Sequence, residues 1–131
     1  MLTYWGRSQT VDKILPGVYY VTTASHGGLM IGAKIAQSLI SPLAISYGAK
    51  MGSWLCYEED CLWAIPAYEH SLIAEYCNFN GLAPLPSQEY HEQVRQVIQH
   101  WYPEYLIEEQ MRQVLNCNGR YKRRGHEEAA R

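Results

Sequence analysis

The apolar positions in the first part of the chain predict strands. Residues 18–23 are β-branched or aromatic throughout, which favours a strand, and Pro16-Gly17 is a turn signal directly before them. Residues 24–28 are predicted to form a loop, because the adjacent glycines Gly27-Gly28 permit backbone angles that other residues avoid. Residues 29–31 are apolar and can pair back on the first strand. We therefore predict an antiparallel hairpin with His26 at its tip.

Helical spacing appears after this hairpin. Gly32 is predicted to open a short helix, which Ser41-Pro42 interrupts because proline lacks an N–H donor and disfavours helix at the residue before it. Residues 48–53 contain two glycines and predict a loop or the entry to a short strand, before a brief apolar run at residues 54–57. Residues 1–17 indicate an irregular or edge segment. The apolar positions of the short helix are Ala36, Leu39, Ile40 and Leu43.

The second half of the chain predicts helices. We expect the chain to be helical from Glu58, with Pro66 kinking that helix or beginning a new one. Residues 78–86 contain asparagine, glycine and two prolines, which predict a loop. Ser87 can cap the next helix, and Pro103 separates that helix from another. The apolar stripes of these segments are Cys61, Leu62 and Ile65; Tyr68, Leu72, Ile73 and Tyr76; Tyr90, Val94, Val97, Ile98 and Trp101; and Ile107, Met111, Val114 and Leu115.

Together these elements predict an α+β fold in which a small antiparallel N-terminal sheet is packed by three to four helices. A length of 131 residues allows one ordinary domain, and Asn118-Gly119 is a helix stop. We expect a single domain over residues 1–119, followed by a basic, flexible tail over residues 120–131.

Composition and charge narrow the class of partner. Hydrophobic residues make up 47 % of the chain, and its eleven tyrosines and four tryptophans suit either a core of amphipathic aromatics or an interface. Residues 1–119 carry six Lys or Arg and eleven Asp or Glu, whereas residues 120–131 carry five and two. An acidic body argues against nucleic-acid binding except through the tail, where Tyr121 could stack on a base. A solvated terminus is the favoured interpretation of that tail.

The start of the chain lacks the long apolar run of a signal peptide, and no apolar run approaches the ~20 residues of a membrane span. We expect a cytoplasmic protein without a membrane contact. Its four cysteines, at positions 56, 61, 77 and 117, are then expected to be free thiols. Zinc is the alternative, but only Cys56 and Cys61 are close in sequence, so we predict no metal and no cofactor.

The densest run of acidic side chains is Glu58, Glu59 and Asp60. One interpretation is a charged helix start, where carboxylates face free N–H groups and the positive end of the helix dipole. The other is that His26 meets one of these carboxylates as a recognition or catalytic pair. We predict that contact, and we predict that Trp54 and Trp63 are buried and hold the hairpin against the acidic-headed helix. The predicted binding residues are His26, Trp54, Glu58, Glu59, Asp60 and Trp63.

Motifs for most catalytic classes are missing. The sequence has no Gly-x-Ser-x-Gly nucleophile elbow, no phosphate-binding Gly-Lys-Ser/Thr loop and no His-Glu-x-x-His metal helix. The remaining enzyme hypothesis is a small hydrolase or nuclease-like enzyme in which His26 acts through a water with Glu58, Glu59 or Asp60. Otherwise we predict no catalytic residues.

The compound pattern of residues 18–70 resembles a family of uncharacterised small domains found in phage, plasmid and other mobile-element proteins of bacteria. Residues 21–28 end in His-Gly-Gly, and residues 57–64 read Tyr-Glu-Glu-Asp-Cys-Leu-Trp-Ala, as the segments of that family do. Pro66 lies earlier than the proline of the family, so the helix after Trp63 can differ here. The resemblance implies an origin rather than an activity. Small acidic proteins of such origin often bind a host machine, so we expect a non-catalytic protein-binding protein. Its expected partner is a host or defence-system protein. We expect the chain to inhibit that partner, as anti-CRISPR proteins inhibit bacterial defence systems.

Overall fold

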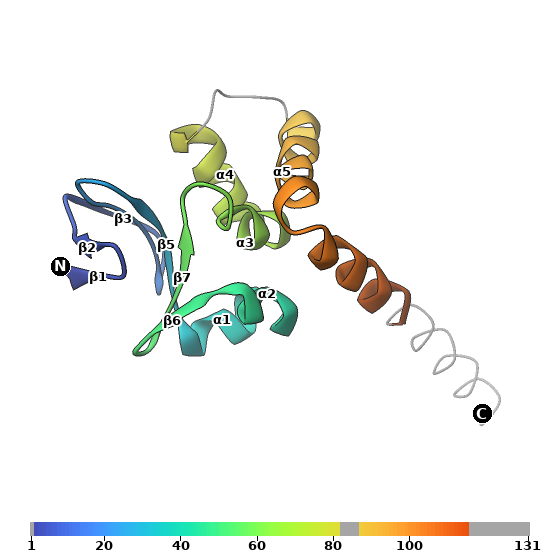
Figure 1. The fold of residues 1–131 in the computed structure, drawn as a ribbon, viewed down its shortest axis with the longest axis horizontal. Helices are drawn as coiled ribbons and strands as arrows, with labels where there is room; N and C mark the ends of the chain where they lie inside the picture. The colour runs from blue at the N-terminus through green and yellow to red at the C-terminus, as the bar shows by residue number, and fades with distance from the viewer. Residues whose placement is uncertain (1, 82–86, 116–131) are drawn as a thin grey trace.

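An antiparallel sheet lies on one side of the protein and helices lie on the other (Figure 1). The structure is a computed structural model that describes residues 2–81 and 87–115. Its main sheet has the strand order β3-β4-β5-β7-β6 with every neighbouring pair antiparallel, and β1 and β2 pair separately. The predicted α+β class with an N-terminal antiparallel sheet is confirmed. The strands are β1 (Leu2–Thr3), β2 (Gly6–Arg7), β3 (Thr10–Leu15), β4 (Val18–Thr22), β5 (Gly27–Gly32), β6 (Ala49–Met51) and β7 (Trp54–Glu58).

The predicted hairpin with His26 in its turn is confirmed. Strands β4 and β5 pair from Val18 opposite Ile31 to Thr22 opposite Gly27, and His26 directly precedes β5. The alternation of a strand places Val18 and Val21 on opposite faces, and both are buried, so β4 is covered on its two sides. The segment expected to be irregular or an edge supplies the edge strand β3.

Two short helices connect β5 to β6, and Ser41-Pro42 separates them as predicted. Helix α1 (Ala33–Leu39) begins directly after Gly32, and α2 (Pro42–Tyr47) begins with proline at its first position, where a missing N–H costs nothing. The Ser41 hydroxyl caps α2 by accepting a hydrogen bond from the Ala44 N–H at 3.0 Å.

The prediction of a helix from Glu58 is wrong. Glu58 is the last residue of β7, residues 59–63 form turns, and α3 (Ala64–Glu69) begins six residues later than expected. The reason is that Glu58 pairs with Gly28 in the sheet while its carboxylate binds the N–H groups of the turn. Pro66 lies in the first turn of α3, where it is tolerated.

The remaining helices pack on the same side of the sheet as α3. Helix α4 (Ser71–Gly81) extends through residues 78–81, which were predicted to be loop, because the buried Ile73 and Cys77 continue its apolar face; residues 82–86 of that predicted loop lie outside the described residues. Helix α5 (Ser87–Trp101) buries its predicted stripe but leaves Trp101 exposed. The buried members of that stripe are Tyr90, Val94 and Ile98.

Residues 103–115 form a further helix, which runs away from the sheet (Figure 1). Interruptions at Ser41-Pro42, His70 and Pro103 divide the described residues into six helices rather than the three or four predicted. The predicted helix stop at residues 118–119 and the predicted tail at residues 120–131 lie outside the described residues.

Buried apolar residues form two clusters, one on each face of the sheet. The larger cluster fills the space between the sheet and the helices, and the smaller one lies on the opposite face with Trp5 and Trp54 packed against it. The smaller cluster consists of Val21, Met30 and Cys56. The largest fully buried members of the main cluster are Tyr57, Tyr105, Leu29, Ile31, Leu55, Ile65, Ile73, Ile98, Val18 and Val94.

Candidate functional site

The His26 turn has a fixed backbone and an exposed imidazole. The Thr23 hydroxyl accepts a hydrogen bond from the His26 N–H at 3.0 Å and donates one to the His26 carbonyl at 2.6 Å. The Thr23 N–H donates to the same carbonyl at 2.7 Å. Thr23 therefore closes the turn, and the His26 side chain is left facing solvent.

The predicted contact between the His26 imidazole and the acidic cluster is not made. Within residues 2–81 and 87–115, the ion pairs at 4.0 Å or less are Arg95–Glu92 and Arg112–Glu109, and neither involves His26. The two segments do lie together, but they meet through their main chains: Glu59 N–H donates to the Gly27 carbonyl at 2.9 Å. Sheet pairing therefore takes the place of the side-chain pair, and the enzyme hypothesis lacks its His26–carboxylate contact.

The carboxylate of Glu58 is occupied by its own turn. It accepts hydrogen bonds from the N–H groups of Asp60, Cys61 and Leu62 at 2.9, 3.0 and 2.9 Å, and from the Cys61 thiol at 3.1 Å. Burial alone would raise the pKa of Glu58, but the hydrogen bonds from Cys61, Leu62 and Asp60 outweigh it and lower this pKa. Glu58 therefore caps the turn after β7, and the predicted charged helix start is wrong because α3 begins only at Ala64.

The other two acidic residues have looser surroundings. The Tyr20 hydroxyl lies 3.5 Å from Oε2 of Glu59, at the limit of a hydrogen bond, and Asp60 is exposed. Burial, followed by the charge of Glu59, raises the pKa of Tyr20 to about 12. Neither carboxylate forms an ion pair with His26 within 4.0 Å.

The two candidate tryptophans lie on opposite faces of the sheet. Trp63 is 9 % exposed and belongs to the main cluster, which confirms that it is buried. Trp54 is only partly buried and packs on the other face, with its ring edge against Tyr19 at a centroid distance of 5.8 Å. Because the sheet separates them, the two rings cannot jointly hold the hairpin against α3, contrary to our prediction.

The Gly27-Gly28 pair serves close packing. A Cβ on Gly28 would lie against the Tyr57 carbonyl oxygen and 2.7 Å from Cη2 of Trp5, and one on Gly27 would lie against the Val21 carbonyl oxygen. Both positions therefore need glycine so that β5 can lie between β4 and β7 beneath the Trp5 ring. Close packing within the sheet therefore explains the two glycines of the His-Gly-Gly motif.

A different surface emerges on the helix at residues 103–115. Its apolar residues were predicted as a helical stripe, and such stripes commonly pack on a core. Instead they are more than half exposed: Ile107 60 %, Met111 60 %, Val114 52 % and Leu115 66 %. We call these four side chains the outer stripe. The spacing of i, i+4, i+7 and i+8 places them on one side of the helix.

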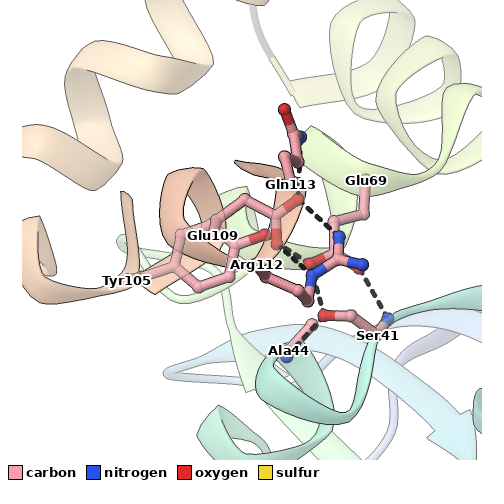
Figure 2. A network of polar contacts seen from close by, with 7 residues as sticks. All are labelled: Ser41, Ala44, Glu69, Tyr105, Glu109, Arg112 and Gln113. Atoms are coloured by element: carbon pink, nitrogen blue, oxygen red, sulfur yellow. Dashed lines mark hydrogen bonds and ion pairs between the residues drawn. The ribbon is translucent and has the colours of Figure 1, made fainter. Parts of the chain in front are cut away.

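The opposite side of this helix is held against the body of the protein. Tyr105 and Leu106 are buried in the main cluster, and the Tyr105 hydroxyl donates to the Glu69 carboxylate. Figure 2 shows the same carboxylate receiving the N–H and the hydroxyl of Ser41, at 2.6 and 2.7 Å. Glu69 thus joins the end of α3 to the start of α2 and to the helix that carries the outer stripe.

A second acidic side chain completes the inner face. Glu109 is only 5 % exposed, and Arg112 grips it with two hydrogen bonds, from Nε at 2.9 Å and from a terminal guanidinium nitrogen at 2.6 Å (Figure 2). Gln113 adds a third at 3.0 Å. The bond to Glu109 raises the pKa of Arg112, so the guanidinium stays charged and neutralises the buried carboxylate.

A polar hollow of about 350 Å³ lies beside this network. The imidazole of His91 stacks on the Tyr68 ring at its rim, with centroids 4.8 Å apart and planes at 17°. The hollow's carboxylates, on Glu69 and Glu109, are already bonded to protein donors, so it is a continuation of the network. Its lining comprises Tyr68, Glu69, His91, Glu109, Arg112 and Gln113.

The thiols and the metal-ligand residues suggest no further site. Cys56, Cys61 and Cys77 are free, as predicted, while Cys117 lies outside the described residues. Burial raises the pKa of the Cys56 and Cys77 thiols to about 11 and 12, so both stay protonated. In the described parts of the chain, no three His, Cys, Asp or Glu side chains are grouped so that they could hold a metal ion. None of the described helices combines the length and the apolar character that crossing a bilayer requires.

Comparison with curated proteins and with solved structures finds no match. A family model, described as a domain of unknown function (DUF7007), matches residues 1–130. Because the match spans almost the whole chain, this protein belongs to the DUF7007 family of domains of unknown function.

Proposed function

We propose that this chain is a non-catalytic protein-binding domain and that the outer stripe is its binding surface. The observation that carries the proposal is the exposure of four large apolar side chains, Ile107, Met111, Val114 and Leu115, along one helix. Exposed apolar side chains that adjoin one another cost free energy in water and commonly mark a surface that a partner covers. An amphipathic helix is also among the recurring means of protein recognition.

The anchoring of the helix supports the same function. Tyr105, Leu106 and Glu109 fix its inner side, so the outer stripe is presented at a defined place without a partner. A surface that is ordered before binding loses less conformational entropy when the complex forms. Trp101, which is 59 % exposed at the end of α5, adds a large aromatic side chain close by in sequence.

The proposed partner is a host or defence-system protein in the bacterial cytoplasm, which the domain inhibits as anti-CRISPR proteins inhibit their targets. The support is the resemblance of residues 18–70 to domains of phage and plasmid proteins, together with small size and an acidic body. The proposed origin is therefore a mobile element.

Affinity capture followed by reconstitution tests the proposal. The tagged chain is used to recover proteins from a bacterial host, the recovered protein is purified, and its affinity and activity are measured with the added domain. We expect binding that Ile107→Ser with Met111→Ser weakens at least tenfold, with inhibition lost in parallel. Leu72→Ser on α4, where the side chain is 50 % exposed, is the matched control and should bind normally.

Equal affinity of the stripe variant and the control would overturn the proposal. So would recovery of no partner together with a hydrolytic or nuclease activity that His26→Ala removes, because that result would establish the enzyme hypothesis instead.

A further inference from the structure

We propose that the outer stripe binds an amphipathic helix of the partner protein, and that this helix carries lysine or arginine along the edge of its apolar face. The inference rests on the proposed function and names the chemistry of the partner. It comes from the shape of the stripe and from the distribution of charge on its two edges.

The shape of the stripe fits another helix. At about 100° and 1.5 Å per residue, the outer stripe is one continuous row on a helix about 20 Å long. A row of this kind packs against the apolar face of a second helix by inserting side chains between those of its neighbour. The row is narrow, so a single helix can cover it.

The charge on the two edges of the stripe is unequal. Glu104 and Glu108 are exposed on one edge, whereas Gln110 lies on the other. The helix has one cation among its described residues, Arg112, and it lies on the inner side, bound to Glu109. The acidic edge therefore has no neutralising side chain on its own helix.

The negative charges of Glu104 and Glu108 affect the hydroxyl of Tyr47, which lies nearby. The Tyr47 hydroxyl lies 3.4 Å from Oε1 of Glu104. Burial, followed by the charges of Glu104 and Glu108, raises the pKa of Tyr47 to about 12. A lysine or arginine of a docked helix would reach both carboxylates from the solvent side, and charged residues at this position of a helix pair govern the choice of partner.

The same charges disfavour a second copy of this chain as the occupant. When two copies of one helix pair in antiparallel fashion about a two-fold axis, like edges face one another. In such a pairing centred on Met111, the two exposed Glu108 side chains would lie on the same edge of the interface, about 9 Å apart along the helix axis. Repulsion between like charges selects against that pairing.

Two synthetic peptides test the proposal directly. Both peptides are 14 residues long and have leucine at the same positions along one side of the helix. One peptide has lysine at all the remaining positions, and its counterpart has glutamate there. Fluorescence anisotropy measures their affinity for the full chain at ~100 mM salt. We expect the lysine peptide to bind at least tenfold more tightly than the glutamate peptide, and Glu104→Gln with Glu108→Gln to reduce that ratio at least threefold. Met111→Ser should weaken the lysine peptide at least tenfold, with Leu72→Ser as the control.

The possible results separate this inference from the proposed function. Equal binding of both peptides, or equal binding of the lysine peptide by wild type and Met111→Ser, overturns the basic-helix proposal. If the native partner still depends on Met111 in that case, the proposed function survives. A dimer in sedimentation that Met111→Ser dissociates would identify a second copy as the occupant and would also overturn the proposal.

Discussion

In the turn after β7, the Glu58 carboxylate accepts hydrogen bonds from Asp60, Cys61 and Leu62, whereas Ile107 and Met111 on the last described helix each leave 60 % of their surface exposed. The first region holds reactive residue types whose bonding capacity is used within the fold. The second holds ordinary aliphatic residues whose burial is left incomplete. Chemical capability of a residue type therefore says less about function here than whether its interactions are already satisfied.

Replacing Trp63 at the end of the turn, or Trp101 two residues before the last described helix, should give the largest contrast. Trp63→Ala removes a ring that is 9 % exposed in the main cluster and should lower the free energy of unfolding by about 3–5 kcal/mol. Trp101→Ala removes a ring that is 59 % exposed and should change it by about 0.5 kcal/mol or less. Urea unfolding of the two variants measures both values. A small loss for Trp63→Ala would mean that this side chain is available to a partner.

The glycine pair gives the next largest effect. Gly28→Ala places a Cβ against the Tyr57 carbonyl and the Trp5 ring, and we expect a loss of about 3 kcal/mol because the backbone of β7 at Tyr57 and Glu58 cannot move away. Gly32→Ala on the same strand is the matched control, since its Cβ would be 3.5 Å from Ile35 Cγ2, an ordinary contact. Thermal unfolding compares them. Similar stability of the two variants would contradict a packing role for the His-Gly-Gly motif.

The sequence predicted the helices and strands well where residues next to an element determine its start or end. The hairpin, the start of α2 at Ser41-Pro42 and the helix after Pro103 each depend on neighbouring residues, so they could be read directly. The start of α3 could not, because Glu58 is held in β7 by pairing with Gly28, thirty positions earlier. Local propensity favoured helix there, and sheet pairing overrode it.

The candidate site was predicted less well for a similar reason. The spacing of Ile107 and Met111 shows an amphipathic helix, but spacing cannot say whether the apolar side is covered. That depends on the inner side, where Tyr105 and Glu109 bond to other groups and turn the stripe outward. Trp54 and Trp63 lie on opposite faces of the sheet and so do not act together as predicted, whereas binding at His26 and the other predicted binding residues stays a prediction.

Weakening the anchor of the last described helix should lower stability by less than the glycine replacement does. Tyr105→Phe removes the hydroxyl that donates to Glu69 and should lower stability by about 1–2 kcal/mol, since a hydrogen bond to a partly buried charge is lost while the ring stays packed. Tyr4→Phe, at an exposed ring, is the control and should be neutral. Partner affinity should fall with Tyr105→Phe as well. Unchanged stability and affinity would show that the outer stripe does not depend on this anchor.

Replacing Glu58 should have the smallest effect on stability, and that effect should depend on pH. Its pKa is lowered in the folded protein, so its carboxylate contributes stability above its unfolded pKa and loses that contribution as the pH falls through the folded value. Glu58→Gln should therefore cost about 1 kcal/mol at neutral pH, reduced by solvent screening, and the difference from wild type should shrink in acid. Urea unfolding from pH 7 to pH 3 measures it. A cost that grows in acid would contradict the capping role.

The central claim is that partner binding occurs at the outer stripe. Hydrogen exchange of the full chain, with and without its purified partner, tests it most directly. The account predicts slower exchange in peptides from residues 103–115 and unchanged exchange in peptides that contain the His26 turn, from Thr23 to Gly28. Protection of the His26 turn with no change along residues 103–115 would contradict the account.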